Sequence, residues 1–457
     1  MFAEYCENVI RAWNGAVADT RANRLIIWGG GHDNYFGNEI YSLNLAANPI
    51  TLTRLKDPTV PTNYSNSGNC IESIPPGTTG FAPNSREDYE GLAFIPTADV
   101  MYVLNGSLAC LEGNGSNATW TIPLNNLSNS TSWSYENPTM TGPQPGVYAG
   151  LGGYAYGDIA VFDPNSGLVF VSDSSALFTY NYQTNTTTRI TAIEGFVTSI
   201  YLSGAIDPVR KLFVAVGGCG KGSCGPGDGV YVADISNPTH TVQQNWTAAT
   251  MADANCAQFL AGGANPLNAS NPGFVYDPVA NDFVGWPNEG NSVYILTPDT
   301  VNKKLTCKVV TFPNGPPNSS HANNTPNTSL GTFGRFAYFP AYDIFVLVND
   351  WNIPAYILKL RGSGGFTLFA CNGNTVSYDV NIGPVGSFSG TVNLSVSGLP
   401  SGATYVFSPA SITTSGTSIL TVNIPSGTPA GSSTLTITGT SGSLSQSSNV
   451  TLNWGCH

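Results

Sequence analysis

The sequence has few charged residues, and the scarcity excludes several classes of protein. Only 10% of its 457 residues are charged, against roughly 25% in an average soluble protein. A disordered chain is rich in charge and poor in aromatics, whereas this one is 11% aromatic. With 16 Lys+Arg against 28 Asp+Glu and a net charge of −12, it lacks the basic clusters that bind nucleic acid. It also has no apolar run of about 18 residues, so we expect no transmembrane segment.

The sequence also lacks the common metal and hydrolase motifs. There is no GxSxG, no HExxH and no CxxC, which argues against an α/β-hydrolase, a zincin and a structural zinc site. No DxDxDG-like spacing occurs either, although the Asp- and Asn-rich turns leave calcium possible. We therefore expect no cofactor, with calcium as the one open alternative.

The nine cysteines indicate disulfides and hence an oxidising compartment. The amino terminus has neither the basic nor the apolar region of a signal peptide, so we expect the targeting segment to be missing from this sequence. The predicted location is extracellular or at the cell surface. Cys6 is left over, either as a buried thiol or bonded to another chain or a longer amino terminus. The expected pairs are Cys219–Cys224, Cys371–Cys456, Cys70–Cys110 and Cys256–Cys307.

A unit of 40–50 residues recurs six times between residues 1 and 362. Each copy has an apolar strand, a turn of the Asp-Pro or Pro-Ala kind, a second apolar strand and then one or two more strands. Such a period with four strands is typical of a β-propeller, in which blades pack face to face. The sequence therefore predicts an all-β fold with a propeller of six blades, or of seven if leftover segments such as 1–12 form another.

The composition changes sharply at residues 361–365, RGSGG, which we expect to be a flexible linker. From 366 to 457 the only Asp, Glu, Lys or Arg is Asp379, and short alternating strands are separated by Pro, Gly and Ser turns. This pattern predicts a β-sandwich over 366–457. The expected domains are a propeller over 1–362 and this sandwich.

Both parts resemble known families. The tail, with SGTVNLSVSGLPSGATYVFSP from residue 389 onward, resembles the Ig-like repeats of secreted and surface bacterial proteins, which implies a spacer or adhesion module. The front, with WGGGHDNYFGNEIYSLNL at 28–45 and GTFGRFAYFPAYDIFVLVND at 331–350, resembles kelch-type propellers of the galactose-oxidase-like superfamily. That resemblance implies the fold. Some propellers of related shape are polysaccharide lyases, and others bind glycans or proteins. Copper-radical oxidase chemistry is excluded because no histidine follows a tyrosine here.

One group of residues predicts a lyase-like catalytic site. An imidazole beside phenols can remove the proton next to a uronate carboxyl group, and an arginine can neutralise that carboxylate. The alternative is that these groups hydrogen-bond between blades and hold the ring closed. Asp88 stands where the family commonly has a histidine, which weakens the catalytic interpretation. The candidate residues are His32, Tyr35, Arg86, Tyr89 and Arg335.

Three functions are compatible with these features. The first is a non-catalytic protein that recognises an extracellular glycan or surface protein through a propeller face rich in Tyr, Trp and Asn. The second is a polysaccharide lyase or a related glycan-active enzyme. The third is a structural subunit of a surface layer or filament, in which charge-poor strands of the tail pair at their edges.

Overall fold

The structure is a computed structural model. It describes the chain except residues 1–7, 32–34, 48, 60–81, 105, 110–117, 137, 142–157, 173–176, 191–198, 221–229, 238–241, 245, 262–271, 289, 313–314, 317–330, 351–353, 362–364, 371–374, 384–387, 426–427, 430 and 455–457. The described residues form mostly β-structure, as the sequence predicts.

The first three sheets come from the first half of the chain. In every one of them, the main strands are antiparallel, and each main strand pairs with the next one in the sequence. The first sheet contains β1 (Ala16–Asp19), β2 (Arg24–Ile27), β3 (Ile40–Asn44) and β4 (Thr51–Lys56). The second contains β6 (Leu92–Ile95), β7 (Val100–Leu104), β9 (Thr119–Pro123) and β10 (Ser134–Tyr135), beside a small pair of β5 (Arg86–Glu87) and β8 (Ser107–Leu108). The third contains β12 (Ile159–Phe162), β13 (Val169–Ser172), β14 (Leu177–Asn181) and β15 (Thr186–Ile190), with β11 (Thr139–Thr141) added parallel to β15.

The next three sheets repeat this order. The fourth contains β16 (Ser199–Asp207), β17 (Leu212–Gly220), β18 (Val230–Asp234) and β19 (Val242–Gln244). The fifth contains β20 (Gly273–Asp277), β21 (Asp282–Trp286), β22 (Ser292–Asp299) and β23 (Lys304–Thr311). The sixth begins with β24 (Phe336–Phe339), β25 (Ile344–Leu347), β26 (Tyr356–Lys359) and β27 (Gly365–Ala370).

The turn between the first and second strand has the same backbone feature in all six sheets. One residue there has a positive φ, a left-handed conformation that Gly, Asn and Asp adopt most easily. This shared turn explains why each copy of the repeat places a polar residue or glycine just before its second strand. The residues are Asn23, Asp99, Gly167, Lys211, Asn281 and Asp343.

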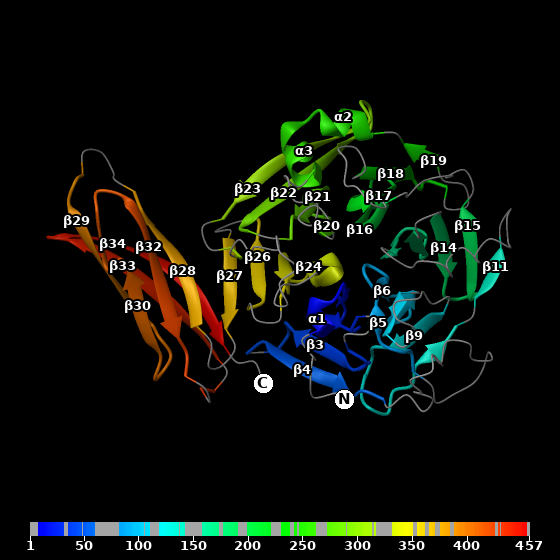
Figure 1. The fold of residues 1–457 in the computed structure, drawn as a ribbon, viewed down its shortest axis with the longest axis horizontal. Helices are drawn as coiled ribbons and strands as arrows, with labels where there is room; N and C mark the ends of the chain where they lie inside the picture. Colours follow the sequence, from blue (N-terminus) through cyan, green and yellow to red (C-terminus); the bar gives the residue numbers. More distant parts are fainter. Residues whose placement is uncertain are drawn as a thin grey trace.

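The six sheets follow one another around a common centre (Figure 1). Each first strand contacts the first strand of the next sheet, in the order β1, β6, β12, β16, β20 and β24, and β24 contacts β1 again. We call this arrangement the ring. Its amino rim is the end at which the first strands begin, and its hairpin rim is the end with the turns between first and second strands.

Polar side chains tie neighbouring sheets together at the hairpin rim. Arg24 of the first sheet donates from Nη2 to the Leu124 carbonyl of the second at 2.6 Å. Arg210 of the fourth donates from Nη1 to the Asn281 carbonyl of the fifth at 2.6 Å. Arg361, just after β26, binds Asp277 of the fifth sheet at 2.5 Å and also pairs with Asp343 of the sixth.

The tail forms two facing sheets, one of which continues the sixth sheet of the ring. Its strands are β28 (Thr375–Ile382), β29 (Thr391–Ser397), β30 (Thr404–Ser408), β31 (Ser411–Thr413), β32 (Gly416–Asn423), β33 (Gly431–Ser441) and β34 (Leu444–Trp454). One sheet has the order β28-β32-β30, and the other runs β27-β34-β33-β29-β31. β27 pairs antiparallel with β26 of the ring and parallel with β34 of the tail. Side chains from the ring, such as Phe345, and from the tail, such as Leu420, belong to one buried apolar cluster.

The helices are short. They are α1 (Asn8–Arg11), α2 (Thr247–Met251), α3 (Ala254–Ala261) and the 3-10 turn η4 (Phe333–Arg335). Residues 8–11, considered for a seventh blade, are thus helical. In the part of the chain that the structure covers, none of these helices has the length and apolar character needed to cross a membrane.

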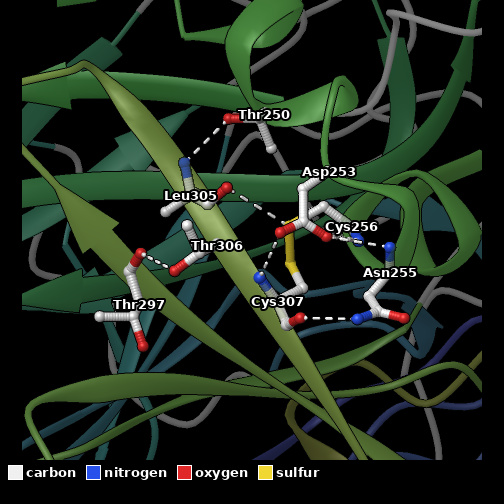
Figure 2. The surroundings of a disulfide bond; sticks show 8 residues. All are labelled: Thr250, Asp253, Asn255, Cys256, Thr297, Leu305, Thr306 and Cys307. Atoms are coloured by element: carbon white, nitrogen blue, oxygen red, sulfur yellow. Dashed lines mark hydrogen bonds between the residues drawn. A yellow bond between two sulfur atoms is a disulfide. The ribbon is translucent and has the colours of Figure 1, made fainter.

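A disulfide joins α3 to β23 through Cys256 and Cys307, whose Cα atoms lie 5.0 Å apart (Figure 2). This bond confirms one of the predicted pairs. Figure 2 also shows Asn255 reaching the Cys307 carbonyl, a bond of 3.0 Å that fixes the helix to the strand beside the sulfurs. The side chains of the other predicted pairs and of Cys6 lie outside the described residues.

Candidate functional site

The candidate residues gather at the amino rim, where the chain enters its first strands. The backbone N–H of Tyr89 donates to the Trp13 carbonyl at 2.9 Å, and that of Glu90 donates to the Asp158 carbonyl at 3.2 Å. The segments that precede β1, β6 and β12 therefore lie side by side. Burial at this rim is nearly complete, since Arg86, Asp88, Tyr89 and Arg335 are each 0% exposed.

Arg335, at the end of η4, directs its guanidinium at backbone carbonyls. Its Nε donates to the Asn14 carbonyl at 2.8 Å, and its Nη1 donates to the carbonyls of Val348 and Asn349 at 2.9 and 2.8 Å. Nη2 donates to the Gly331 carbonyl. Burial lowers the pKa of Arg335 to about 10, although the nearby carboxylates of Asp350, Asp88 and Glu90 favour its charge. This side chain joins the sixth sheet to the start of the first.

Asp88 lies on the other side of the same connection. Its Oδ1 accepts the backbone N–H of Gly15 at 2.6 Å, while its buried Oδ2 has no hydrogen-bond partner. Burial raises the pKa of Asp88 well above its ordinary value; the Gly15 N–H, Arg335 and Arg86 oppose that shift, and Glu87 adds to it. Burial thus favours the neutral form of this carboxyl group over the ionised form.

Gly29 makes close packing around Asp88 possible. Its φ is +112°, and a Cβ there would lie 2.5 Å from Asp88 Oδ2 and 2.7 Å from Asn14 Oδ1. A larger residue would collide with both oxygens. Glycine is therefore required at this position for steric reasons as well as for its freedom to turn.

Glu90 connects three sheets near the centre of the ring. It precedes the second sheet, and the Gly334 backbone and the Ser203 side chain on β16 both favour its ionised form, while its buried Oε2 has no hydrogen-bond partner among the described residues. Burial raises its pKa well above the ordinary value, and the neighbouring Asp88 adds to that rise.

The candidate residues Tyr89 and Arg86 also have internal partners. Tyr89 donates its hydroxyl to Glu87 Oε2 at 2.7 Å and packs edge-on against Phe333 at 5.8 Å. Arg86 donates from Nε to the Asn84 carbonyl at 3.1 Å, and its guanidinium lies 5.7 Å from the centre of the Trp28 ring. These contacts hold the segment before β6 against the first sheet.

Tyr35 is 2% exposed and donates its hydroxyl to Glu39 Oε1 at 2.6 Å. Tyr41 donates to the same oxygen at 3.1 Å. His32, the proposed base, lies outside the described residues. The structure thus places four of the five candidate residues at one rim, each buried and each with partners in the protein.

Three residues that shape this rim were not singled out in the sequence, namely Asn14, Glu87 and Glu90. A signal was present, because SREDYEG has four ionisable D/E/R side chains within seven residues of a charge-poor chain. In such a chain, a charge cluster next to a buried strand indicates internal pairing.

The described residues bear on two expectations about ligands. Among them, no three or more His, Cys, Asp or Glu side chains come together as metal ligands do. The tryptophans that the propeller face was expected to present are mostly core residues. Those with less than a tenth of their surface exposed are Trp28, Trp120, Trp133, Trp246, Trp286 and Trp454.

Comparisons with known proteins give only a distant likeness. No protein-family model matches the chain, and no curated protein matches it. Among solved structures, it is similar to an auxiliary nutrient binding protein from Bacteroides ovatus, with 11% identity, a TM-score of 0.38 and coverage of 79% of this chain and 86% of that one. Another such protein, from Bacteroides thetaiotaomicron, has 12% identity, a TM-score of 0.36 and coverage of 77% and 83%. A protein provisionally assigned as a 6-phosphogluconolactonase from Bacteroides uniformis has 10% identity, a TM-score of 0.36 and coverage of 77% and 81%. At these values the likeness carries no argument about function.

Proposed function

We propose that the chain is a six-bladed, kelch-like β-propeller followed by an Ig-like sandwich, and that it binds an extracellular polymer without catalysis. Six sheets with the same strand order and the same hairpin turn support the six blades. The cycle of first-strand contacts supports their closure into a propeller. Two facing sheets with a shared core support the sandwich. The Cys256–Cys307 bond supports a location outside the cell or at its surface.

The non-catalytic assignment rests on one observation, the burial and the hydrogen bonds of Arg335. A catalytic arginine must offer free donors to a substrate carboxylate. Arg335 is fully buried and directs its donors at four backbone carbonyls. Arg86 is equally buried, so both candidate arginines serve the fold.

The charge of the protein narrows the class of polymer. A net charge of −12 repels polyanions at a distance, and the two buried arginines cannot offset it. We therefore propose an uncharged glycan or a surface protein as the ligand. For a glycan, side-chain amides would hydrogen-bond sugar hydroxyls.

Binding and cleavage can be separated in one experiment. The full chain is tested for retention on neutral glucans and mannans, on polygalacturonate and alginate, and on extracellular matrix protein, while the ultraviolet absorbance of each soluble polymer is followed. The proposal expects retention on a neutral or protein polymer and no rise in absorbance. Formation of ultraviolet-absorbing unsaturated sugars would identify a lyase instead. In that case, if His32→Ala lost this product while its melting temperature stayed unchanged, His32 would be assigned as the catalytic base.

A further inference from the structure

The three-stranded sheet of the tail has two edges with different surroundings. β28 forms one edge and contacts β27, the strand shared with the ring. β30 forms the other edge, and Figure 1 shows it on the side of the tail that faces away from the ring. A second molecule can approach β30 without meeting the ring of the first.

The β30 edge is short and is followed directly by Pro409, but within its five residues it lacks protection by charge or proline. Natural sheets protect their edges with charged side chains, prolines or bulges. Thr404–Ser408 contains no charged residue and no proline, and Tyr405 and Val406 are 42% and 63% exposed. The other edge, β28, carries Asp379, the only Asp, Glu, Lys or Arg from residue 366 to the end.

The sequence of β30 is complementary to itself. When Thr-Tyr-Val-Phe-Ser is paired antiparallel with an identical strand about Val406, Tyr405 lies opposite Phe407 and Thr404 opposite Ser408. Aromatic pairs and Thr–Ser pairs are among the cross-strand combinations that stabilise antiparallel sheets. Tyr405 and Phe407 already share a face, with ring centres 5.9 Å apart. Phe407 is only 8% exposed within the apolar cluster, so Tyr405 is the ring that offers free surface to a partner.

The distribution of charge favours the same partner. The tail carries one of the 44 charged residues of the chain, and the ring carries nearly all of the net charge of −12. Two rings therefore repel each other, whereas two β30 strands bring no like charges together. A second copy is the partner whose chemistry fits this edge.

We propose that two copies of this chain associate through their β30 edges, antiparallel and about a twofold axis, so that the two three-stranded sheets become one continuous sheet. Such isologous contacts are the commonest way in which identical subunits form dimers. One five-residue strand buries much less than the roughly 1,600 Å² of a standard interface, so the association is weak and depends on concentration.

Sedimentation velocity of the full chain over a dilution series tests this proposal. The wild type is expected to move from monomer to dimer as concentration rises, and Val406→Lys to raise the dissociation constant about tenfold or more. Ser377→Lys, an exposed position on β28, is the matched control and should dimerise like the wild type. A wild type that stays monomeric throughout, or a Val406→Lys variant that dimerises normally, overturns the proposal.

A crosslinking variant keeps the proposal testable if Val406→Lys lowers the melting temperature. The twofold axis passes beside residue 406, so Val406→Cys should crosslink to its own copy under mild oxidation, and non-reducing peptide mapping should find a peptide joined to itself at that position. Ser377→Cys should give no such product. Equal crosslinking of the two variants would show random collision and would overturn the assignment of the edge.

Discussion

Asp88 and Arg335 hold opposite sides of one peptide group. The Gly15 N–H donates to Asp88 Oδ1 at 2.6 Å, and Arg335 Nε donates to the Asn14 carbonyl of the same peptide at 2.8 Å. Asp88 belongs to the second sheet, Arg335 to the sixth, and the peptide leads into the first. The Arg335 bond joins the last sheet to the first across 321 residues of sequence, and the Asp88 bond joins the second sheet to the first at the same peptide.

Replacement of Arg335 by glutamine should destabilise the fold. The change leaves several of four buried carbonyls without donors, and each unsatisfied group costs about 1–3 kcal/mol. We expect the free energy of unfolding in urea to fall by about 3 kcal/mol or more. Arg21→Gln is the control, because Arg21 is 56% exposed in its ion pair with Asp99 and should change stability by less than about 0.5 kcal/mol. A folded Arg335→Gln protein of normal stability would show that the ring closes without this bond.

The raised pKa of Asp88 predicts a pH dependence of stability. Because the pKa of Asp88 is higher in the folded protein than in the unfolded chain, where it is about 4, its contribution to stability is fully present below about pH 4 and is lost as pH rises through the folded pKa. Glu90 acts in the same direction. In urea unfolding between about pH 4 and pH 8, the contribution of these two groups to the free energy of unfolding should therefore decline as pH rises.

Asp88→Asn isolates this contribution. An amide mimics the protonated acid, so we expect the variant to be at least as stable as the wild type at neutral pH and to have a weaker pH dependence. Asp57→Asn, at an exposed ion pair with Arg54, should leave the profile unchanged. A large loss of stability in Asp88→Asn at neutral pH would mean that Asp88 is ionised beside Arg335.

Trypsin should cut slowly after Arg361, contrary to the flexible linker expected from RGSGG. Its guanidinium binds Asp277 and Asp343, and that hydrogen bonding lowers the pKa of Asp343 to about 2. The protease must withdraw this side chain before cleavage. Asp343→Asn should speed release of the tail fragment, measured by mass spectrometry over time, whereas Asp299→Asn, at an exposed turn, should not. Rapid cleavage of the wild type after Arg361 would instead support the flexible linker expected from the sequence.

Loss of the Cys256–Cys307 bond should weaken the fifth sheet. The two cysteines are 51 residues apart, for which the chain-entropy model gives about 4 kcal/mol. We expect the Cys256→Ser, Cys307→Ser double variant to lose stability of this order in urea unfolding. Non-reducing peptide mapping of the wild type should also find Cys219 joined to Cys224 and Cys371 joined to Cys456. Equal stability of the variant and the oxidised wild type would mean that the contacts of α3 alone fix it to β23.

The sequence predicted the repeated features well, because each depends on local chemistry. Alternating apolar residues around a turn such as Asp277–Asn281 specify a hairpin wherever they occur, and six copies produced six sheets. The burial of Arg335 could not be predicted in the same way. Its carbonyl partners lie in segments distant in sequence, and an arginine in a strand pattern does not indicate which backbone groups will surround it. The double pairing of β27 was missed for a similar reason, since the sequence of a strand does not show which strands lie on its two sides.

The position of β27 between β26 and β34 has a mechanical consequence. A pull on the carboxyl end of β34 acts along strands whose hydrogen bonds lie across the direction of the force, so these bonds are loaded together instead of one after another. If the tail is fixed to a surface, tension between that surface and a ligand on the ring passes through this continuous sheet into the sixth blade. This load path differs from that of a module joined to the ring by a single flexible segment.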